Sequence, residues 1–221
     1  VEVPPPLPYE FETLPGLRRG DPDREFVVIR SRNLRLPFTR LHTMVSEPGE
    51  DKIAFLHRVR ADLVTYSDKQ VFEACGEICT DGENHAVIVT TTSASMYCLI
   101  KEICPKGFVS TGQGIHSHCP YYGNVRATEA DERISDGKLR KGKAYSRCDT
   151  ERFSSVDFSG RRPGWLAGRK ALYRHDGPTR IDTFHPDAQS GSAAGAAPAP
   201  CVRPWSPPRS CGARRPAACS S

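Results

Sequence analysis

The pattern that most constrains the fold is an amphipathic helical segment followed at once by strand-like runs. From Asp51 to Tyr66 the apolar residues recur at steps of three and four, at Ile53, Leu56, Val59 and Leu63. This spacing predicts a helix with one apolar face. Residues 71–79 and the β-branched run 85–92 come next and are typical of strands. Because the apolar face of such a helix must be buried on another element, the order predicts an α/β fold.

Further strands are expected at 26–29, at 108–118, around Trp165, around Tyr173 and over 180–184. Residues 96–103 are apolar enough for either a strand or a short helix, and their pattern does not choose between the two. The expected fold class is α/β, a mixed β-sheet flanked by helices in an α-β sandwich.

The chain of 221 residues is expected to hold a single domain with extensions at both ends. Residues 1–48 begin rich in proline and are predicted to be an arm or linker. Residues 49–186 are the predicted domain. Residues 187–221 contain almost only Ala, Pro, Ser, Gly and Arg and cannot bury a core, so disorder is expected there. A native tail and a frameshift product are equally open origins for this last segment.

The net charge of +5 does not indicate a basic surface for nucleic acid. Residues 187–221 carry four arginines and one aspartate, so +3 of this charge lies in the tail and only +2 in the rest. No run approaches the roughly 18 apolar residues of a membrane helix, and the start lacks a basic-then-apolar signal pattern. A cytoplasmic protein is therefore expected, with secretion by a signal-independent route left open.

Three separated segments carry the residue types of a hydrolytic zinc site. His116 and His118 have one residue between them, so on a strand they project to the same side. A catalytic zinc takes three protein ligands and keeps a fourth position for water, and Asp157 is the expected third ligand. Glu73 is the expected general base, which takes a proton from the water and passes it to the leaving nitrogen. Ser154 is expected to donate a hydrogen bond to the oxyanion or the water.

The order Glu, His-x-His, Ser-x-x-Asp resembles the JAMM, or MPN-type, metalloprotease family. Residues 73–76, Glu-Ala-Cys-Gly, have the Glu-x-Cys-Gly form that often surrounds the catalytic Glu of that family. The segments 163–167 and 171–176 are similar to two strands of a bacterial branch of unknown function. The resemblance covers roughly residues 50–185. It implies a JAMM-like sandwich, Zn²⁺ as the metal, and hydrolysis of a peptide or isopeptide bond.

The chain departs from the family pattern after the second histidine. In the family a proline follows directly, and only a handful of residues precede Ser-x-x-Asp, whereas here Cys119 intervenes and residues 121–153 form an insertion. A Thr-x-x-Asp within this charged insertion makes Asp131 an alternative third ligand. The insertion is expected to be a solvated excursion or a flap over the site. Glu77 is an alternative to Glu73 as the base, because residues four apart on a strand face the same side.

Nine cysteines require an explanation. The six that precede the tail include no Cys-x-x-Cys pair of the kind that structural zinc sites favour. Cys75 and Cys79 are expected to be small buried apolar side chains in a reducing compartment. The thiolate of Cys119, next to a predicted ligand, could bind the metal or make the site sensitive to oxidation. The histidines outside the pair, His175 among them, are expected to be incidental.

The function that the motifs predict is a zinc-dependent hydrolase of peptide or isopeptide bonds. Its partner would be a protein or peptide substrate, with ubiquitin-like conjugates among the candidates. An alternative of a different class is a non-catalytic MPN-type scaffold for protein interaction. A third is the catalytic end of a secreted bacterial toxin or effector, since the chain begins with Val and has a proline-rich arm. The oligomeric state is left open.

Overall fold

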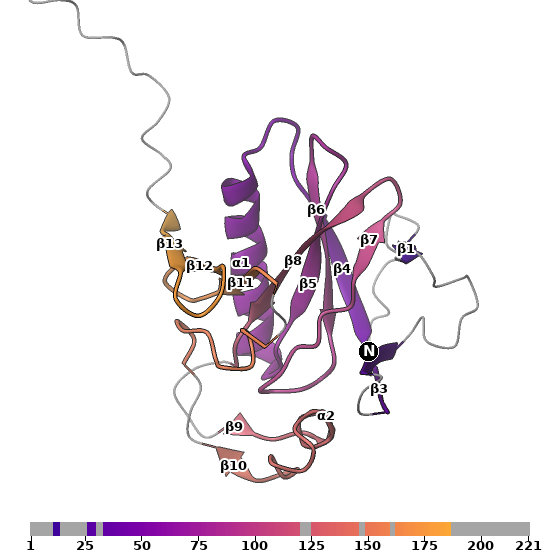
Figure 1. Ribbon diagram of the computed structural model, residues 1–221, viewed down its shortest axis with the longest axis vertical. Coiled ribbons are helices and arrows are strands. Elements are labelled where there is room, and N and C mark those ends of the chain that lie inside the picture. The colour runs from indigo at the N-terminus through magenta and orange to yellow at the C-terminus, as the bar shows by residue number, and fades with distance from the viewer. Residues whose placement is uncertain are drawn as a thin grey trace, which may run out of the picture. The chain divides into compact units, whose positions relative to one another are not determined.

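The computed structural model describes residues 11–13, 26–29, 33–119, 125–145, 149–159 and 162–186. At their centre is a seven-stranded mixed sheet (Figure 1). Its order is β13 (Ile181–Phe184), β12 (Leu172–His175), β11 (Gly164–Ala167), β8 (Val109–Ser117), β5 (Cys75–Thr80), β6 (His85–Thr91) and β4 (Thr39–Val45). Strands β8 and β11 pair in parallel, and all the other adjacent strands in this order pair antiparallel. The expected mixed α/β class is confirmed.

One face of the sheet is covered by α1 (Lys52–Gln70) (Figure 1). Asp51 caps the helix, because its carboxylate accepts the N–H groups of Ile53 and Ala54 at 2.8 and 3.3 Å. The helix ends at Val71, whose backbone is left-handed with φ 63°. The apolar side chains buried between α1 and the strands include Phe55, Leu56, Val59 and Leu63. The helix predicted over 51–66 is confirmed and continues to residue 70.

The two faces of β5 have different partners. Ile78 packs in the core beneath α1, whereas Cys75 and Cys79 alternate onto the opposite face. Cys75 is bonded to Cys98, and Cys79 is bonded to Cys104. On that second face, one disulfide therefore holds the connection between β6 and β7 (Ile103–Pro105) through Cys98, and the other holds β7 itself through Cys104. Most of residues 96–103, for which a strand and a short helix were both considered, form neither.

The expectation of free thiols in a reducing compartment is wrong for Cys75 and Cys79. Both side chains are fully buried, as expected, but each is joined to a cysteine 23 or 25 residues further along the chain. Cys119 is disulfide-bonded as well, which excludes it as a thiolate ligand. Disulfides persist in oxidising compartments and are rare in the cytosol. The bonded cysteines thus argue against the reducing environment that was expected.

The N-terminal region contributes to the folded unit. β4 is the edge strand of the large sheet and pairs with β6, so residues 39–45 are not part of a linker. This corrects the boundary predicted after residue 48. The strand expected at 26–29 is present as β2 (Phe26–Ile29), which forms an antiparallel hairpin with β3 (Leu34–Pro37). β1 (Phe11–Thr13) pairs with β7, and the predicted tail 187–221 lies outside the described residues.

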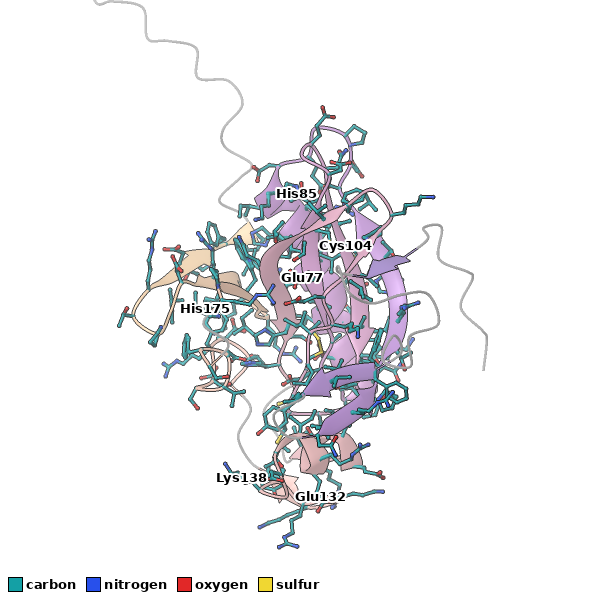
Figure 2. All side chains as sticks on the ribbon, turned by 45° about the vertical axis from the view of Figure 1, so that its right-hand side comes forward. Glu77, His85, Cys104, Glu132, Lys138 and His175 are labelled. Carbon is teal, nitrogen blue, oxygen red and sulfur yellow. A yellow bond between two sulfur atoms is a disulfide. The ribbon has the colours of Figure 1, made fainter. Side chains whose placement is uncertain are left out.

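The insertion is a packed element rather than a solvated excursion. Its described part contains β9 (Val125–Arg126), α2 (Glu129–Ile134) and β10 (Ala144–Tyr145). Asp131 on α2 is fully buried and accepts the N–H groups of Ser95 and Met96 at 3.0 and 2.9 Å. Ile134 packs against the β2–β3 hairpin in a smaller core. In Figure 2, Glu132 and Lys138 mark the insertion.

Neither of the two helices in the described part of the chain is long and apolar enough to cross a membrane.

Each disulfide should contribute measurably to stability. The double variant Cys75→Ala/Cys98→Ala is expected to lose about 3 kcal/mol of unfolding free energy, because the bond restricts the unfolded chain over a separation of 23 residues. The double variant Cys79→Ala/Cys104→Ala should lose a similar amount, since its separation is 25 residues. Urea denaturation measures both, with the parent protein in dithiothreitol as the fully reduced control. Variants as stable as the oxidised parent would contradict these bonds.

Candidate metal centre

The end of β8 presents two histidines on the same side. His116 lies on β8 and His118 follows its last residue, so both rings occupy the sheet face away from α1. Ser117, between them, points the other way. Its hydroxyl lies 2.6 Å from the hydroxyl of Ser67 on α1 and accepts the N–H of Ala74 at 3.0 Å. The buried serine therefore fixes the direction in which the two rings point.

Asp157 comes from the segment 149–159, which passes over the same face. Its Oδ2 atom accepts the backbone N–H and the hydroxyl of Ser154 at 2.6 and 2.8 Å. The N–H of Asp157 donates in turn to the carbonyl of Ser154 at 3.2 Å. The residues that follow Ser154 form turns rather than a helix. Ser154 thus orients the carboxylate that the sequence predicts as the third ligand.

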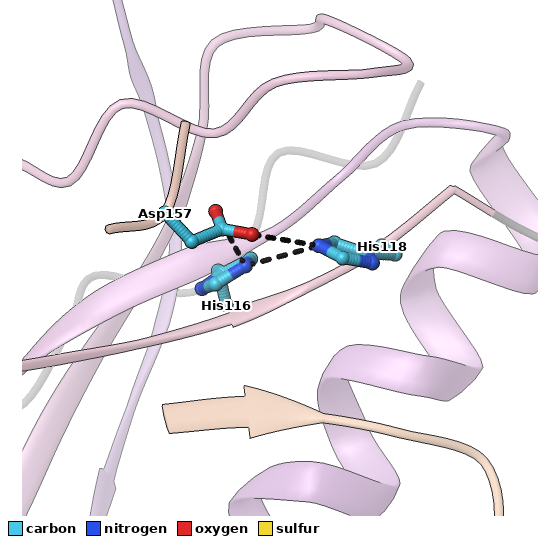
Figure 3. A group of neighbouring side chains, drawn as sticks. All are labelled: His116, His118 and Asp157. Carbon is cyan, nitrogen blue, oxygen red and sulfur yellow. Dashed lines mark hydrogen bonds and ion pairs between the residues drawn. The ribbon is translucent and has the colours of Figure 1, made fainter. Parts of the chain in front are cut away.

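The three predicted ligands converge (Figure 3). His116 Nε2 lies 3.2 Å from His118 Nε2 and 3.2 Å from Asp157 Oδ1. His118 Nε2 lies 3.5 Å from Asp157 Oδ2. Ligand atoms at 2.0–2.2 Å from a tetrahedral ion are about 3.3–3.6 Å apart, which is close to these separations. Two imidazole nitrogens and one carboxylate oxygen in this arrangement could hold a metal ion.

The charges of the site depend on one another. Burial lowers the pKa of His118, but Asp157 and Glu73 outweigh this effect and raise it to about 9. Burial raises the pKa of Asp157, but the imidazoles of His116 and His118 hold it well below its usual range. His118 Nδ1 lies 2.7 Å from the carbonyl oxygen of Asp149, which leaves Nε2 directed at the other ligands. The site therefore favours a positive charge beside Asp157.

Glu73 lies next to the ligands and lines the same cavity. It lies two residues before the start of β5 and is only 4% exposed. Its backbone is held on both sides, since its N–H donates to the carbonyl of Ala94 and its carbonyl accepts the hydroxyl of Thr91. Burial raises the pKa of Glu73 to about 8, against the opposing charge of His118. Such a carboxyl group can take up and release a proton near neutral pH.

The alternative candidates have other partners. Asp131 uses its oxygens on backbone N–H groups of the 95–96 turn and of its own helix start, where Thr128 forms a capping box with it. Glu77 lies further along β5 and pairs with Arg162 at 3.1 Å. Neither belongs to the group of converging ligand atoms. The geometry therefore favours Asp157 as the ligand and Glu73 as the base.

Glu151 holds the ligand-bearing segment against the sheet, and no sequence motif indicated it. Its Oε1 atom accepts the N–H groups of Arg169 and Lys170, in the turn between β11 and β12, at 2.8 and 3.2 Å. Its Oε2 atom accepts the hydroxyl of Tyr173 at 2.8 Å. Burial and this carboxylate raise the pKa of Tyr173 to about 12. Asp149, whose carbonyl contacts His118, is only two residues away, so Glu151 attaches this part of the segment to the sheet.

His175 was expected to be incidental but supports the same segment. It is only 3% exposed, and its ring makes edge contacts with Phe153 and Phe158 at centroid distances of 4.6 and 5.0 Å. Phe153 also lies 6.2 Å from the ring of His116. These two phenylalanines flank the Ser-x-x-Asp turn, so the aromatic cluster holds the turn beside β8.

A cavity of about 570 Å³ opens onto the metal ligands. Its lining includes Glu73, the connection 96–100 that the disulfides hold, and, further along the sheet, Glu77 and Arg162. This volume lies within the range of about 300–1,000 Å³ that is usual for ligand sites. The candidate metal centre is thus part of a cleft that could receive a substrate.

No protein-family model, no curated protein and no solved structure matches this chain. The resemblance to the JAMM-type metalloproteases therefore rests on the motifs, their order and the residues around them.

The two aspartates should differ in their effect on metal binding. Asp157→Asn is expected to abolish binding, because the site loses its anionic ligand. Asp131→Asn should keep about one ion per chain but lose about 1–3 kcal/mol of unfolding free energy, since an amide N–H₂ would then face backbone donors. Elemental analysis after dialysis against zinc measures the first effect, and urea denaturation the second. Loss of metal in the Asp131 variant alone would reverse the assignment.

Removing Glu151 should weaken the metal site without removing a ligand. Glu151→Ala is expected to lower zinc affinity by about 10- to 100-fold, because the segment with Asp157 and Asp149 loses its attachment to the β11–β12 turn. Glu83→Ala, which removes an exposed carboxylate from a distant turn, is the matched control. Competition with a chromophoric chelator measures the affinity. Equal affinities for both variants would show that Glu151 does not position the site.

Proposed function

We propose that this protein is a zinc-dependent hydrolase of peptide or isopeptide bonds, with a JAMM-like arrangement of its site. The observation that carries the proposal is the convergence of His116, His118 and Asp157 beside the buried carboxyl group of Glu73. Two imidazoles and a carboxylate are the ligand set of hydrolytic zinc enzymes, and a separate carboxylate is the usual general base.

His116, His118 and Asp157 would hold the ion from one side and leave its other side open to the cavity. When bound, Zn²⁺ supplies Lewis acidity, which polarises a carbonyl oxygen and lowers the pKa of a water. The connection 96–100, which the Cys75–Cys98 disulfide holds, forms part of the wall of this cavity.

Glu73 would act as the general base and then as the general acid. Its carboxylate takes a proton from the attacking water and delivers the proton to the nitrogen that leaves as the C–N bond breaks. The Ser154 hydroxyl donates to Asp157 Oδ2 and would turn its one hydrogen to the scissile carbonyl oxygen as negative charge develops there, while the Ser154 N–H keeps its bond to Asp157. The substrate would be a protein or a peptide, and conjugates of ubiquitin-like proteins are one class to test.

The disulfides support the secreted form of the hypothesis over a cytoplasmic one. Cys75, Cys79 and Cys119 are all bonded, and Cys75 lies directly opposite His116 across the β5–β8 pair. A site built on disulfides is suited to an oxidising environment. We therefore infer that the domain acts in an oxidising environment, which is the condition that the secreted form of the hypothesis requires.

Glu73→Gln should retain zinc and lose turnover. The amide cannot accept the proton, so kcat is expected to fall by about 10²- to 10⁴-fold while metal content stays at the parent level. Ser154→Ala should lower kcat by about 10²- to 10³-fold if its hydroxyl stabilises the transition state. The assay uses zinc-loaded protein with quenched fluorescent peptides and with a lysine-linked ubiquitin-like conjugate. A zinc-loaded parent that cleaves neither class would refute the hydrolase and leave a binding scaffold.

A further inference from the structure

The cavity extends along the sheet from the metal ligands to Glu77. Cys75 is paired with His116 in the register of β5 and β8, and Glu77 is paired with Gly114. Glu77 is therefore two residues along the strand from the histidine, a separation of roughly 7 Å at the rise of a β-strand. His116 and Glu77 both line the same cavity. Figure 2 shows Glu77 on the central part of the sheet.

Glu77 has one oxygen with partners and one without. It is 1% exposed, and its Oε1 atom accepts the hydroxyl of Ser110 and an N–H of Arg162, the latter at 3.1 Å. Its Oε2 atom is buried and has no hydrogen-bond partner in the part of the chain that the structure describes. A buried acceptor without a partner is destabilising, so such a group in a cavity points to a ligand.

The neighbouring arginine does not leave a donor directed at this oxygen. Arg162 Nε donates to the carbonyl of Gly112 at 3.0 Å, and its two terminal nitrogens pair with Glu77 and Glu102. Two carboxylates thus share the single charge of Arg162, so this charge is not given to Glu77 alone. Burial raises the pKa of Glu77 against the effects of Ser110, Arg162 and the backbone N–H of Gly112, so an additional cation nearby would stabilise the carboxylate.

We propose that the Glu77 end of the cavity is a specificity subsite for a lysine or arginine side chain of the substrate. The cation would donate to Glu77 Oε2. Since an extended peptide advances about 3.3 Å per residue, the cationic residue would lie within two residues of the bond at the metal centre. This inference rests on the proposed function, because it names the substrate class of that site.

The test compares the binding of two short fluorescein-labelled alanine peptides that differ only in one residue, lysine or norleucine. Norleucine keeps the aliphatic stem and removes the charge. Zinc-loaded full-length Glu73→Gln is the receptor, so that the peptides are not cleaved, and fluorescence anisotropy gives the affinities. We expect lysine to bind about tenfold more tightly, as for a hydrogen bond to a charged group.

The preference should disappear when Glu77→Gln is added and should remain when Glu83→Gln is added instead. Glu83 is exposed on a distant turn, so its variant removes the same charge without touching the cavity. Zinc content and urea denaturation show whether the Glu77 variant is folded. If the Glu77 variant is unfolded, the comparison of the lysine and norleucine peptides on the parent receptor decides the proposal.

Equal binding of both peptides by the parent receptor would overturn the subsite, as would failure of the lysine peptide to bind. A lysine preference that survives Glu77→Gln would overturn it too. A preference that depends on Glu77 in a protein that cleaves no substrate would retain the subsite and refute the hydrolase, so the two proposals fail separately.

Discussion

The candidate site depends on the antiparallel register of β5 and β8. This register places Cys75 opposite His116, so the residue two before Cys75, Glu73, comes to lie beside His118. Ser117 fixes the register at this end, because its N–H donates to the carbonyl of Ala74 while its side chain faces α1. A shift by one residue would turn the histidines into the helix-packed core and bury two imidazoles without partners.

The two faces of the sheet have different roles, since one carries the apolar core and the other carries the candidate site. Residues that alternate toward α1 form the main apolar core, and residues that alternate away from it carry Glu73, His116 and Glu77. That second face is covered by an irregular connection rather than by a long helix, and irregular backbone offers less apolar area to bury. The disulfides from Cys75 and Cys79 add covalent attachments to the apolar contacts that Ala94 and Leu99 make there.

Local patterns were sufficient for α1, the main strands and the candidate ligands, because helical periodicity and the His-x-His alternation depend only on neighbouring residues. They failed where a role depends on residues far apart. The partner of Cys75, Cys98, lies in a segment with no regular structure, and Glu151 accepts hydrogen bonds from a turn 18 and 19 residues further on. Asp131 has a convincing Thr-x-x-Asp context, yet in the structure that motif is a helix cap, as the same residue types often are.

The charges around the candidate ligands favour a cation at this position of the fold. Glu73 and Asp157 are two carboxyl groups on a mostly buried face, and together they raise the affinity of His118 for a proton. The arrangement is therefore stabilised by a positive charge between the ligand atoms, supplied either by a proton or by a metal cation. Since a metal binds only the deprotonated imidazole, the two compete for the same position. A metal cation bound there would supply the positive charge that the proton on His118 otherwise supplies. Glu73 would then remain able to take up and release a proton of its own.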